Sequence, residues 1–316
     1  MANIFVQKEM NPLVNAITHT APHHGDEVFA TAMLSFLFPL HVYRTRDQEL
    51  IDSLMGTPGY IIYDVGGVYN PALGAYDHHG RDFHAKRDDG ILYSSAGLIW
   101  RDYGVAVVMS ISPDLKAAQA QVVVDKIDSI LIRGIDARDN GASEEVDEMT
   151  VSDVVSSFNP NWDDESDPDD GFVEACEFAR MVLEREVKAV ASVLRGVYFV
   201  ERAIADSNGA YIILERYVGG WIETVLKSHN PKANGLLYCV FHAKNGDWNV
   251  QAIPPSFDRL LGQRKPFPES WRGLRDGDLV SASGVETATF CHNAGFFAVA
   301  KTRGDAIALA TLAAEA

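Results

Sequence analysis

Short apolar segments that end in a histidine or an aspartate alternate with helical segments along the first half of the chain. Ala16-Ile17-Thr18 leads into His19, and Tyr60-Ile61-Ile62-Tyr63 leads into Asp64. Such alternation of strands and helices predicts a mainly parallel sheet with helices on both faces. Ligands of these sheets bind beyond the carboxyl ends of the strands. Because His19 and Asp64 both fall at predicted strand ends, we expect them to face a binding site.

The segments between these strands have the apolar spacing of helices. One helix is expected from Asp26 to Phe38, where Pro39 stops it, and a longer one over Val122 to Ile132. Ser94 and Ser95 are suitable caps for a further helix. The first half of the chain is therefore interpreted as an α/β domain.

Histidine and aspartate gather in four clusters within this region. The clusters are His19-Thr20-Ala21-Pro22-His23-His24-Gly25-Asp26-Glu27, Asp64-Val65-Gly66-Gly67, Asp77-His78-His79 and Asp136-Ala137-Arg138-Asp139. Imidazole and carboxylate without thiolate suit a hard or borderline divalent ion such as Mn²⁺ or Mg²⁺. Several such groups together can hold two ions, and paired metals are a recurring device of phosphoester hydrolysis.

Composition divides the chain into three parts. Residues 1–160 are expected to form the metal-binding catalytic domain, and 161–197 an acidic loop and a connector helix. Six acids between Asp163 and Asp170 indicate a solvated loop, and Phe172 to Arg195 has helical spacing. Residues 198–316 are expected to form a smaller α+β domain that binds substrate. Its expected strands are Tyr211–Leu214, Gly235–Phe241 and Trp248–Ile253.

Charge and composition exclude several function classes. The net charge of -17 repels long nucleic acid and anionic membranes, so it favours a small or short phosphorylated substrate. No apolar run approaches the length of a membrane span, and no signal peptide is evident, so a cytoplasmic protein is expected. Cys176, Cys239 and Cys291 are far apart and are interpreted as reduced thiols. A serine-hydrolase elbow and a P-loop are both absent.

An ordered set of motifs resembles the Myg (melanocyte proliferating gene) family, a branch of the DHH phosphoesterase superfamily. That superfamily includes RecJ-type exonucleases, family II inorganic pyrophosphatases and oligonucleotide-degrading phosphodiesterases. The motifs are Thr18 to Glu27, Asp64 to Pro71, Tyr76 to His79, Ser94 to Ile99, Asp136 to Gly141, Gln251 to Pro254, Pro268 to Asp276 and Phe290 to Phe296. The resemblance implies a DHH-type parallel-sheet domain followed by the smaller α+β domain.

The resemblance also implies two divalent metal ions, with Mn²⁺ foremost and Mg²⁺ or Co²⁺ as alternatives. The ligands that it implies for one ion are His19, His24 and Asp64, and for the other Asp26, Asp64, His78 and either Asp136 or Asp139. Asp64 would bridge the two ions, and a metal-activated hydroxide would be the nucleophile. His79 would stabilise charge or donate a proton, and Asp77 would orient the histidines. The role of His23 stays open.

Substrate contacts are expected mainly from the second domain. The residues assigned to them are Ser94, Ser95, Arg264, Arg272, Arg275, His292, Asn293 and Gly295. The serines can cap a helix that points at a phosphate, and the arginines can clamp phosphate in a bidentate manner.

The leading hypothesis is a metal-dependent phosphodiesterase, by resemblance a 3′-5′ exonuclease on RNA or short oligonucleotides. A small-molecule phosphatase or pyrophosphatase is the alternative that the acidic surface favours. A regulatory protein that binds metal without catalysis is a third hypothesis, which the intact ligand set disfavours. The expected partners are RNA or oligonucleotide ends, without a membrane, and a homo-oligomer stays open.

Overall fold

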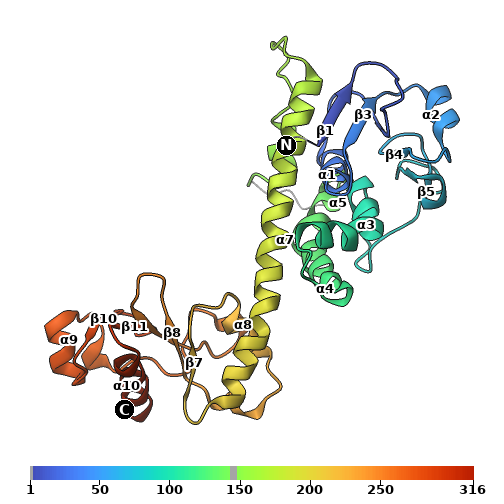
Figure 1. Ribbon diagram of the computed structural model, residues 1–316. Coiled ribbons are helices and arrows are strands. Elements are labelled where there is room, and N and C mark those ends of the chain that lie inside the picture. The colour runs from blue at the N-terminus through green and yellow to red at the C-terminus, as the bar shows by residue number, and fades with distance from the viewer. Residues whose placement is uncertain (1–2, 143–147) are drawn as a thin grey trace. The chain divides into compact units, whose positions relative to one another are not determined.

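The computed structural model describes residues 3–142 and 148–316, which form a mixed α/β protein (Figure 1). The chain divides into two compact units, Met1–Ala191 and Ser192–Ala316. Helix α7 (Pro168–Asp206) is one continuous helix that starts in the first unit and ends in the second. Each unit has a sheet of its own, so each is described separately.

The first unit contains a six-stranded sheet in the order β1-β3-β2-β4-β6-β5. Its strands are β1 (Ile4–Gln7), β2 (Ala16–Thr18), β3 (Leu40–Arg44), β4 (Ile61–Tyr63), β5 (Tyr69–Asn70) and β6 (Ala75–Tyr76). All neighbours pair in parallel except β5 and β6, which are antiparallel. The expectation of a mainly parallel sheet is therefore confirmed.

Three neighbouring strands of this sheet end at one edge. Ala16 of β2 pairs with Ile61 of β4, and Tyr63 of β4 pairs with Tyr76 of β6. All three strands run in the same direction, so the residues that follow them emerge side by side. Those residues include His19 and Asp64, as expected from the sequence.

The helices of the first unit are α1 (Gly25–Leu34), α2 (Gln48–Leu54), α3 (Ser95–Ile111), α4 (Ala117–Ile127), α5 (Arg133–Asp139) and α6 (Val151–Ser156), with a 3₁₀ turn η1 (Pro71–Leu73) and a π-helical turn η2 (Asp128–Ile132). The three expected helices are present with shifted ends, and three further helices, α2, α5 and α6, were not predicted. Helix α1 ends four residues before the expected Phe38. Pro39 disfavours helical backbone at the residue before it, and the chain then enters β3, a strand that the sequence pattern did not predict.

The acidic run between Asp163 and Asp170 is not purely a solvated loop. Asp169 lies in the first turn of α7, and its carboxylate accepts a hydrogen bond of 2.9 Å from Nη1 of the buried Arg44. Lys8 donates to Asp167 and Asp169 at 2.6 and 2.7 Å. Spacing along the chain did not indicate these cations, because both lie more than a hundred residues away in sequence.

The second unit contains a five-stranded sheet in the order β10-β11-β9-β8-β7, antiparallel except between β7 and β8. Its strands are β7 (Tyr211–Leu214), β8 (Tyr238–His242), β9 (Trp248–Ala252), β10 (Ala288–Cys291) and β11 (Phe297–Ala300). The helical segments are α8 (Trp221–Lys227), α9 (Asp276–Ser283), α10 (Arg303–Glu315) and the 3₁₀ turns η3 (Pro231–Gly235), η4 (Phe257–Arg259) and η5 (Glu269–Trp271). The three expected strands β7, β8 and β9 are confirmed.

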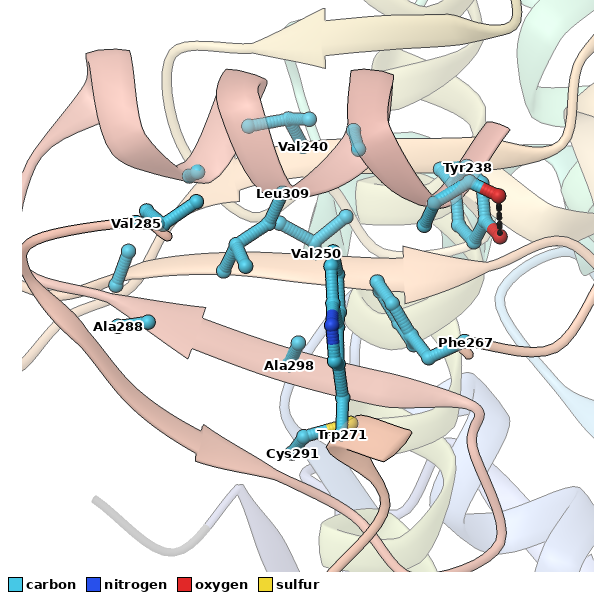
Figure 2. Packing of buried hydrophobic residues seen from close by; sticks show 14 of the residues in the cluster. Tyr238, Val240, Val250, Phe267, Trp271, Val285, Ala288, Cys291, Ala298 and Leu309 are labelled. Atoms are coloured by element: carbon cyan, nitrogen blue, oxygen red, sulfur yellow. Dashed lines mark hydrogen bonds between the residues drawn. The ribbon is translucent and has the colours of Figure 1, made fainter. Parts of the chain in front are cut away.

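One face of this sheet packs against α10 through a hydrophobic core. Figure 2 shows Leu309 of α10 among Val250, Trp271 and Val285, with Phe267 beside Trp271. Burial of such side chains contributes on the order of 2 kcal/mol each. Among the residues described, no helix combines the length and the apolar composition that crossing a membrane requires.

We predict that Gly97→Ala destabilises the first unit. A Cβ at Gly97 of α3 would lie 2.2 Å from Oδ2 of Asp136, which is buried and already hydrogen-bonded. Overpacking of this kind costs about 1–3 kcal/mol. Gly134→Ala in α5 is the matched control, because its Cβ would meet no atom within 4 Å. Denaturant unfolding should give a lower midpoint for the first variant and an equal or higher one for the second. Equal midpoints would contradict the close packing.

Candidate metal centre

A cavity of about 930 Å³ lies at the edge of the first sheet where β2, β4 and β6 end. Six segments far apart in sequence supply the titratable side chains of its wall. They are His19, His24, Asp26, Asp64, Asp77, His78, His79, Arg46, Arg138, Asp139 and Asp153. The cavity, called here the metal-centre cavity, therefore gathers members of all four clusters that the sequence singled out.

Asp64 lies at the centre of this group with its two carboxylate oxygens turned to different histidines. Oδ2 is 3.1 Å from Nε2 of His19, and Oδ1 is 3.4 Å from Nε2 of His78. The backbone of Asp64 has φ of 56°, a left-handed conformation that costs a non-glycine residue about 1–2 kcal/mol. Strained residues of this kind concentrate at functional sites.

One group of potential ligands comprises His19, His24, Glu27 and Asp64, whose ligand atoms lie within 4.8 Å of one another. Nδ1 of His19 is 2.6 Å from the carbonyl oxygen of Thr20. Because a carbonyl only accepts, this contact places the proton on Nδ1 and leaves the Nε2 lone pair for a metal. Glu27 is fully buried and lies 3.1 Å from the same Nε2. Glu27 belongs to the first cluster in the sequence but is not among the ligands expected there.

A second group comprises Asp26, His78 and Asp139, and a third comprises Asp64, Asp77, His78 and His79. Nε2 of His78 is 3.3 Å from Oδ2 of Asp139 and 3.8 Å from Oδ2 of Asp26. The groups share Asp64 and His78, so the site offers more than one position for a cation. Carboxylate and imidazole are ligands that Mn²⁺ accepts.

Two buried polar atoms of this cluster have no hydrogen-bond partner within the described part of the chain, namely Oδ1 of Asp26 and Nε2 of His78. An unsatisfied buried polar atom costs about 1–3 kcal/mol. A cation between them would satisfy both, so the residues present fit a bound metal ion.

The pKa values of the buried carboxylates are shifted in opposite directions. Burial raises the pKa of Asp26 well above its usual value, and the charges of Asp64 and Asp139 raise it further. Burial also raises the pKa of Glu27. Burial opposes ionisation of Asp64 as well, but the hydrogen bond with His19 and the close approach of the His78 imidazole hold its pKa far below the usual range. Asp64 is thus the carboxylate that stays charged at the centre of the cluster.

Asp136 is held by other partners in the structure. Its Oδ1 accepts hydrogen bonds from the Ser94 amide, the Ser94 hydroxyl and the Gly97 amide, and its Oδ2 lies 2.7 Å from Nη2 of the buried Arg87. Between the two alternatives for a ligand, the geometry favours Asp139, which faces His78.

Ser94 and Ser95, which were expected to contact substrate, are hydrogen-bonded to carboxylates in the structure. The Ser95 hydroxyl lies 3.3 Å from Oδ1 of Asp64, and its amide donates to Oδ2 of Asp26. Together with the bonds from Ser94 to Asp136, these contacts occupy the N-terminus of α3 with side-chain anions, which that end of a helix stabilises. A phosphate at the same amides would have to displace them.

Asp77 orients its neighbour. Its Oδ1 lies 2.8 Å from Nδ1 of His79 and accepts from the His79 amide, while its Oδ2 accepts from the Gly67 amide. The hydrogen bond with Asp77 raises the pKa of His79. His79 is 64% exposed, whereas Asp77 is 2% exposed. His23 is buried outside the three ligand groups, with Nε2 3.2 Å from the Val155 carbonyl oxygen.

Arg46 is a functional candidate that the sequence analysis missed. Its Nη2 lies 3.2 Å from Nδ1 of His19, its side chain lines the metal-centre cavity, and it forms no ion pair within the described part of the chain. Arg138 lines the same cavity but pairs with Asp153 at 2.8 Å. The signal in sequence was only an isolated arginine after β3, which has no motif of its own.

The remaining predicted residues lie in the second unit. Arg272 and the turn from His292 to Gly295 come together there: Gly295 has φ of 70°, and a Cβ on it would lie 2.8 Å from Nε of Arg272. The guanidinium of Arg275 stacks on the Phe290 ring at 4.7 Å. Asn293 lies in the same turn. Arg264 uses Nη1 to donate to the carbonyls of Ala233 and Leu236, so it is tied to the backbone.

Comparison with known proteins gives a match over most of the chain. Residues 15–314 match the MYG1 exonuclease family model, described as Uncharacterised protein family (UPF0160). A MYG1 protein of Caenorhabditis elegans is 33% identical, with 94% of each chain covered. The MYG1 exonuclease of Homo sapiens is 29% identical, with 93% of this chain and 84% of the relative covered. A solved pGpG-specific phosphodiesterase from Vibrio cholerae aligns with 95% of this chain and 97% of its own, at 12% identity and a TM-score of 0.25.

Substitution of the two aspartates of α5 should separate their roles. Asp139→Asn removes a charge that faces His78, so we predict that Mn²⁺ affinity falls at least tenfold. The unfolding midpoint should stay equal to that of the wild-type protein. Asp136→Asn removes one of the two carboxylates that pair with the buried Arg87 and the charge of an acceptor that holds Ser94 and Gly97, so we predict a loss of about 1–3 kcal/mol of stability. Titration of Mn²⁺ and denaturant unfolding of both variants test the assignment. The reverse pattern would make Asp136 the ligand.

Metal binding should release a proton near neutral pH. Although burial lowers the pKa of His19, its hydrogen bonds with Asp64 and Glu27 raise it to about 10. A proton on His19 competes with a metal, and its occupancy falls as pH rises, so Mn²⁺ affinity should rise with pH by up to about tenfold per unit. Calorimetric titration at pH 7 in buffers of different ionisation enthalpy counts the released protons. His19→Ala should lower the number of protons released, and an unchanged count would exclude His19 as a source.

Proposed function

The chain belongs to the Myg family, the Uncharacterised protein family (UPF0160) whose curated relatives include MYG1 exonucleases, and from this membership we propose that it is a metal-dependent phosphodiesterase. In finer terms, we propose a DHH-type 3′-5′ exonuclease that acts on RNA or short oligonucleotides with two divalent ions, Mn²⁺ foremost. The family membership confirms the resemblance that the motifs indicated.

The single observation that carries the proposal is the position of Asp64. One of its oxygens faces His19 and the other faces His78, at 3.1 and 3.4 Å, and each histidine has further carboxylates within reach. A carboxylate that serves two ligand groups through separate oxygens is the arrangement that a bridged pair of ions requires. His19, His24 and Glu27 would hold one ion, and Asp26, His78 and Asp139 the other.

The protein's own residues have distinct tasks in this proposal. When bound, two divalent ions polarise the phosphate and lower the pKa of water. Asp77 fixes Nδ1 of His79, which leaves Nε2 of this exposed ring to hold a proton for the departing oxygen. Arg46 supplies a planar cation beside His19 that suits a phosphate. In the second unit, Arg272 and the turn from His292 to Gly295 would contact substrate.

The charge of the chain restricts the substrate. A net charge of -17 opposes long duplexes, because their phosphates meet the same sign of potential over a large area. A single strand end places few phosphates against the protein, next to Arg46 and the metal ions. The same charge also suits pyrophosphate or a mononucleotide, so these compounds belong in the test.

The test compares hydrolysis of a 5′-labelled short RNA with that of pyrophosphate, with Mn²⁺ and after chelation. We expect a Mn²⁺-dependent ladder of shortened RNA and no turnover of pyrophosphate. Asp64→Ala should abolish turnover and weaken both metals, whereas His79→Ala should lower kcat about 10²- to 10⁴-fold with metal content unchanged. Turnover of pyrophosphate without a ladder would make the protein a small-molecule phosphatase. No hydrolysis of any phosphoester by the metal-loaded protein would sink the proposal.

A further inference from the structure

A second cavity, of about 470 Å³, adjoins the metal-centre cavity in the first unit. It is formed by β5 and by the segment that follows His79. Gly67 lines both cavities. A Cβ at Gly80 would lie 2.3 Å from the Gly67 carbonyl oxygen, so backbone alone joins the two walls there. A ligand in one cavity is therefore next to a ligand in the other.

The wall of the second cavity carries two aromatic rings at right angles. The ring centroids of Tyr69 and Phe83 are 6.0 Å apart, with an interplanar angle of 89°. Both side chains are partly exposed, so neither ring is fully covered by the protein. A flat aromatic ligand can stack on one ring and meet the edge of the other, which are the two favoured geometries of aromatic pairs.

The aromatic wall continues directly into the metal ligands. The Phe83 ring centroid is 6.2 Å from that of His78, and the His78 ring is 4.1 Å from the His79 ring. A base on Phe83 and a phosphate at the metal centre would therefore be close enough to belong to the same nucleotide. Successive bases of a single strand bind proteins in this way, by stacking on aromatic side chains.

The second cavity also has a cation at its rim. Arg81 lines it, is exposed, and forms no ion pair within residues 3–142 and 148–316. Asp82 lines the same cavity, so the rim carries both signs of charge, and Arg81 is the group there that can meet a phosphate. Guanidinium binds phosphate in a bidentate manner.

We propose that the second cavity is a nucleobase subsite. The base of the nucleotide whose phosphate occupies the metal centre stacks on one of the rings of Tyr69 and Phe83 and meets the edge of the other, and Arg81 contacts a phosphate of the same strand. This inference rests on the proposed function and deepens it, since it assigns the substrate class to nucleotides over phosphate compounds without a base. Stacking reads no particular base, so the subsite accepts all four.

The experiment measures equilibrium binding of 5′-AMP and of ribose 5-phosphate to the full chain in saturating Mn²⁺. The two probes share the phosphate and the sugar and differ in the base. Stacking of one base is worth about 1–3 kcal/mol, so we expect wild-type protein to prefer 5′-AMP by roughly 5- to 150-fold. The metal centre contributes equally to both probes and cancels from this ratio.

Two variants locate the preference. Tyr69→Leu and Phe83→Leu keep an apolar side chain but remove the flat ring, so each should lower the ratio of 5′-AMP affinity to ribose 5-phosphate affinity. Tyr69 contacts Tyr76, Phe83 and Arg101 and none of the proposed metal ligands. Phe5→Leu is the matched control, because Phe5 is 41% exposed on β1, at the opposite edge of the sheet.

The outcomes separate this inference from the proposed function. Turnover of RNA together with equal affinity for the two probes would refute the subsite and leave the phosphodiesterase intact. A preference for 5′-AMP that survives in both Tyr69→Leu and Phe83→Leu would also refute it. If wild-type protein hydrolyses no phosphodiester and binds neither probe, both proposals fail.

Discussion

The parallel pairing of β2, β4 and β6 is the constraint on which the rest of the first unit depends. Adjacent strands lie about 4.8 Å apart, so the side chains that follow them are held within reach of a common ligand. His19, Asp64 and His78 come from these three ends. Helix α1 then brings Asp26 and Glu27 to the same edge. The left-handed backbone at Asp64 turns the chain immediately after β4.

The sheet brings together more negative charge than the interior tolerates alone. Asp26 and Glu27 are fully buried beside Asp64, and burial raises the pKa of both. His19 offsets part of this charge as a cation, with its pKa raised to about 10. Divalent ions would offset the negative charge further while they displace the proton of His19. The repulsion between the carboxylates, which destabilises the fold, therefore favours metal binding.

A separate ionic network supports the site from behind. Asp136 accepts hydrogen bonds from the amides at the N-terminus of α3 and pairs with Arg87. Arg87 also pairs with Asp128 of η2. These contacts fasten α3 to α5, the helix that carries Asp139. Ser95 of α3 meanwhile donates to Asp64 and Asp26. Residues that resemble phosphate contacts in sequence therefore hold the carboxylates in place.

The sequence by itself determined the kinds of side chain that gather at the site, the strands that lead into His19 and Asp64, and the mainly parallel sheet, because apolar runs and the residues that follow them are local signals. Only the tertiary structure placed Asp139 beside His78 and Asp136 beside Arg87, and it brought Glu27 to His19 and Arg46 to the metal-centre cavity. It also joined Arg44 and Lys8 to the acidic run. These contacts arise from strand pairing and packing between distant segments, and no local pattern in the sequence encodes the distance between two such segments.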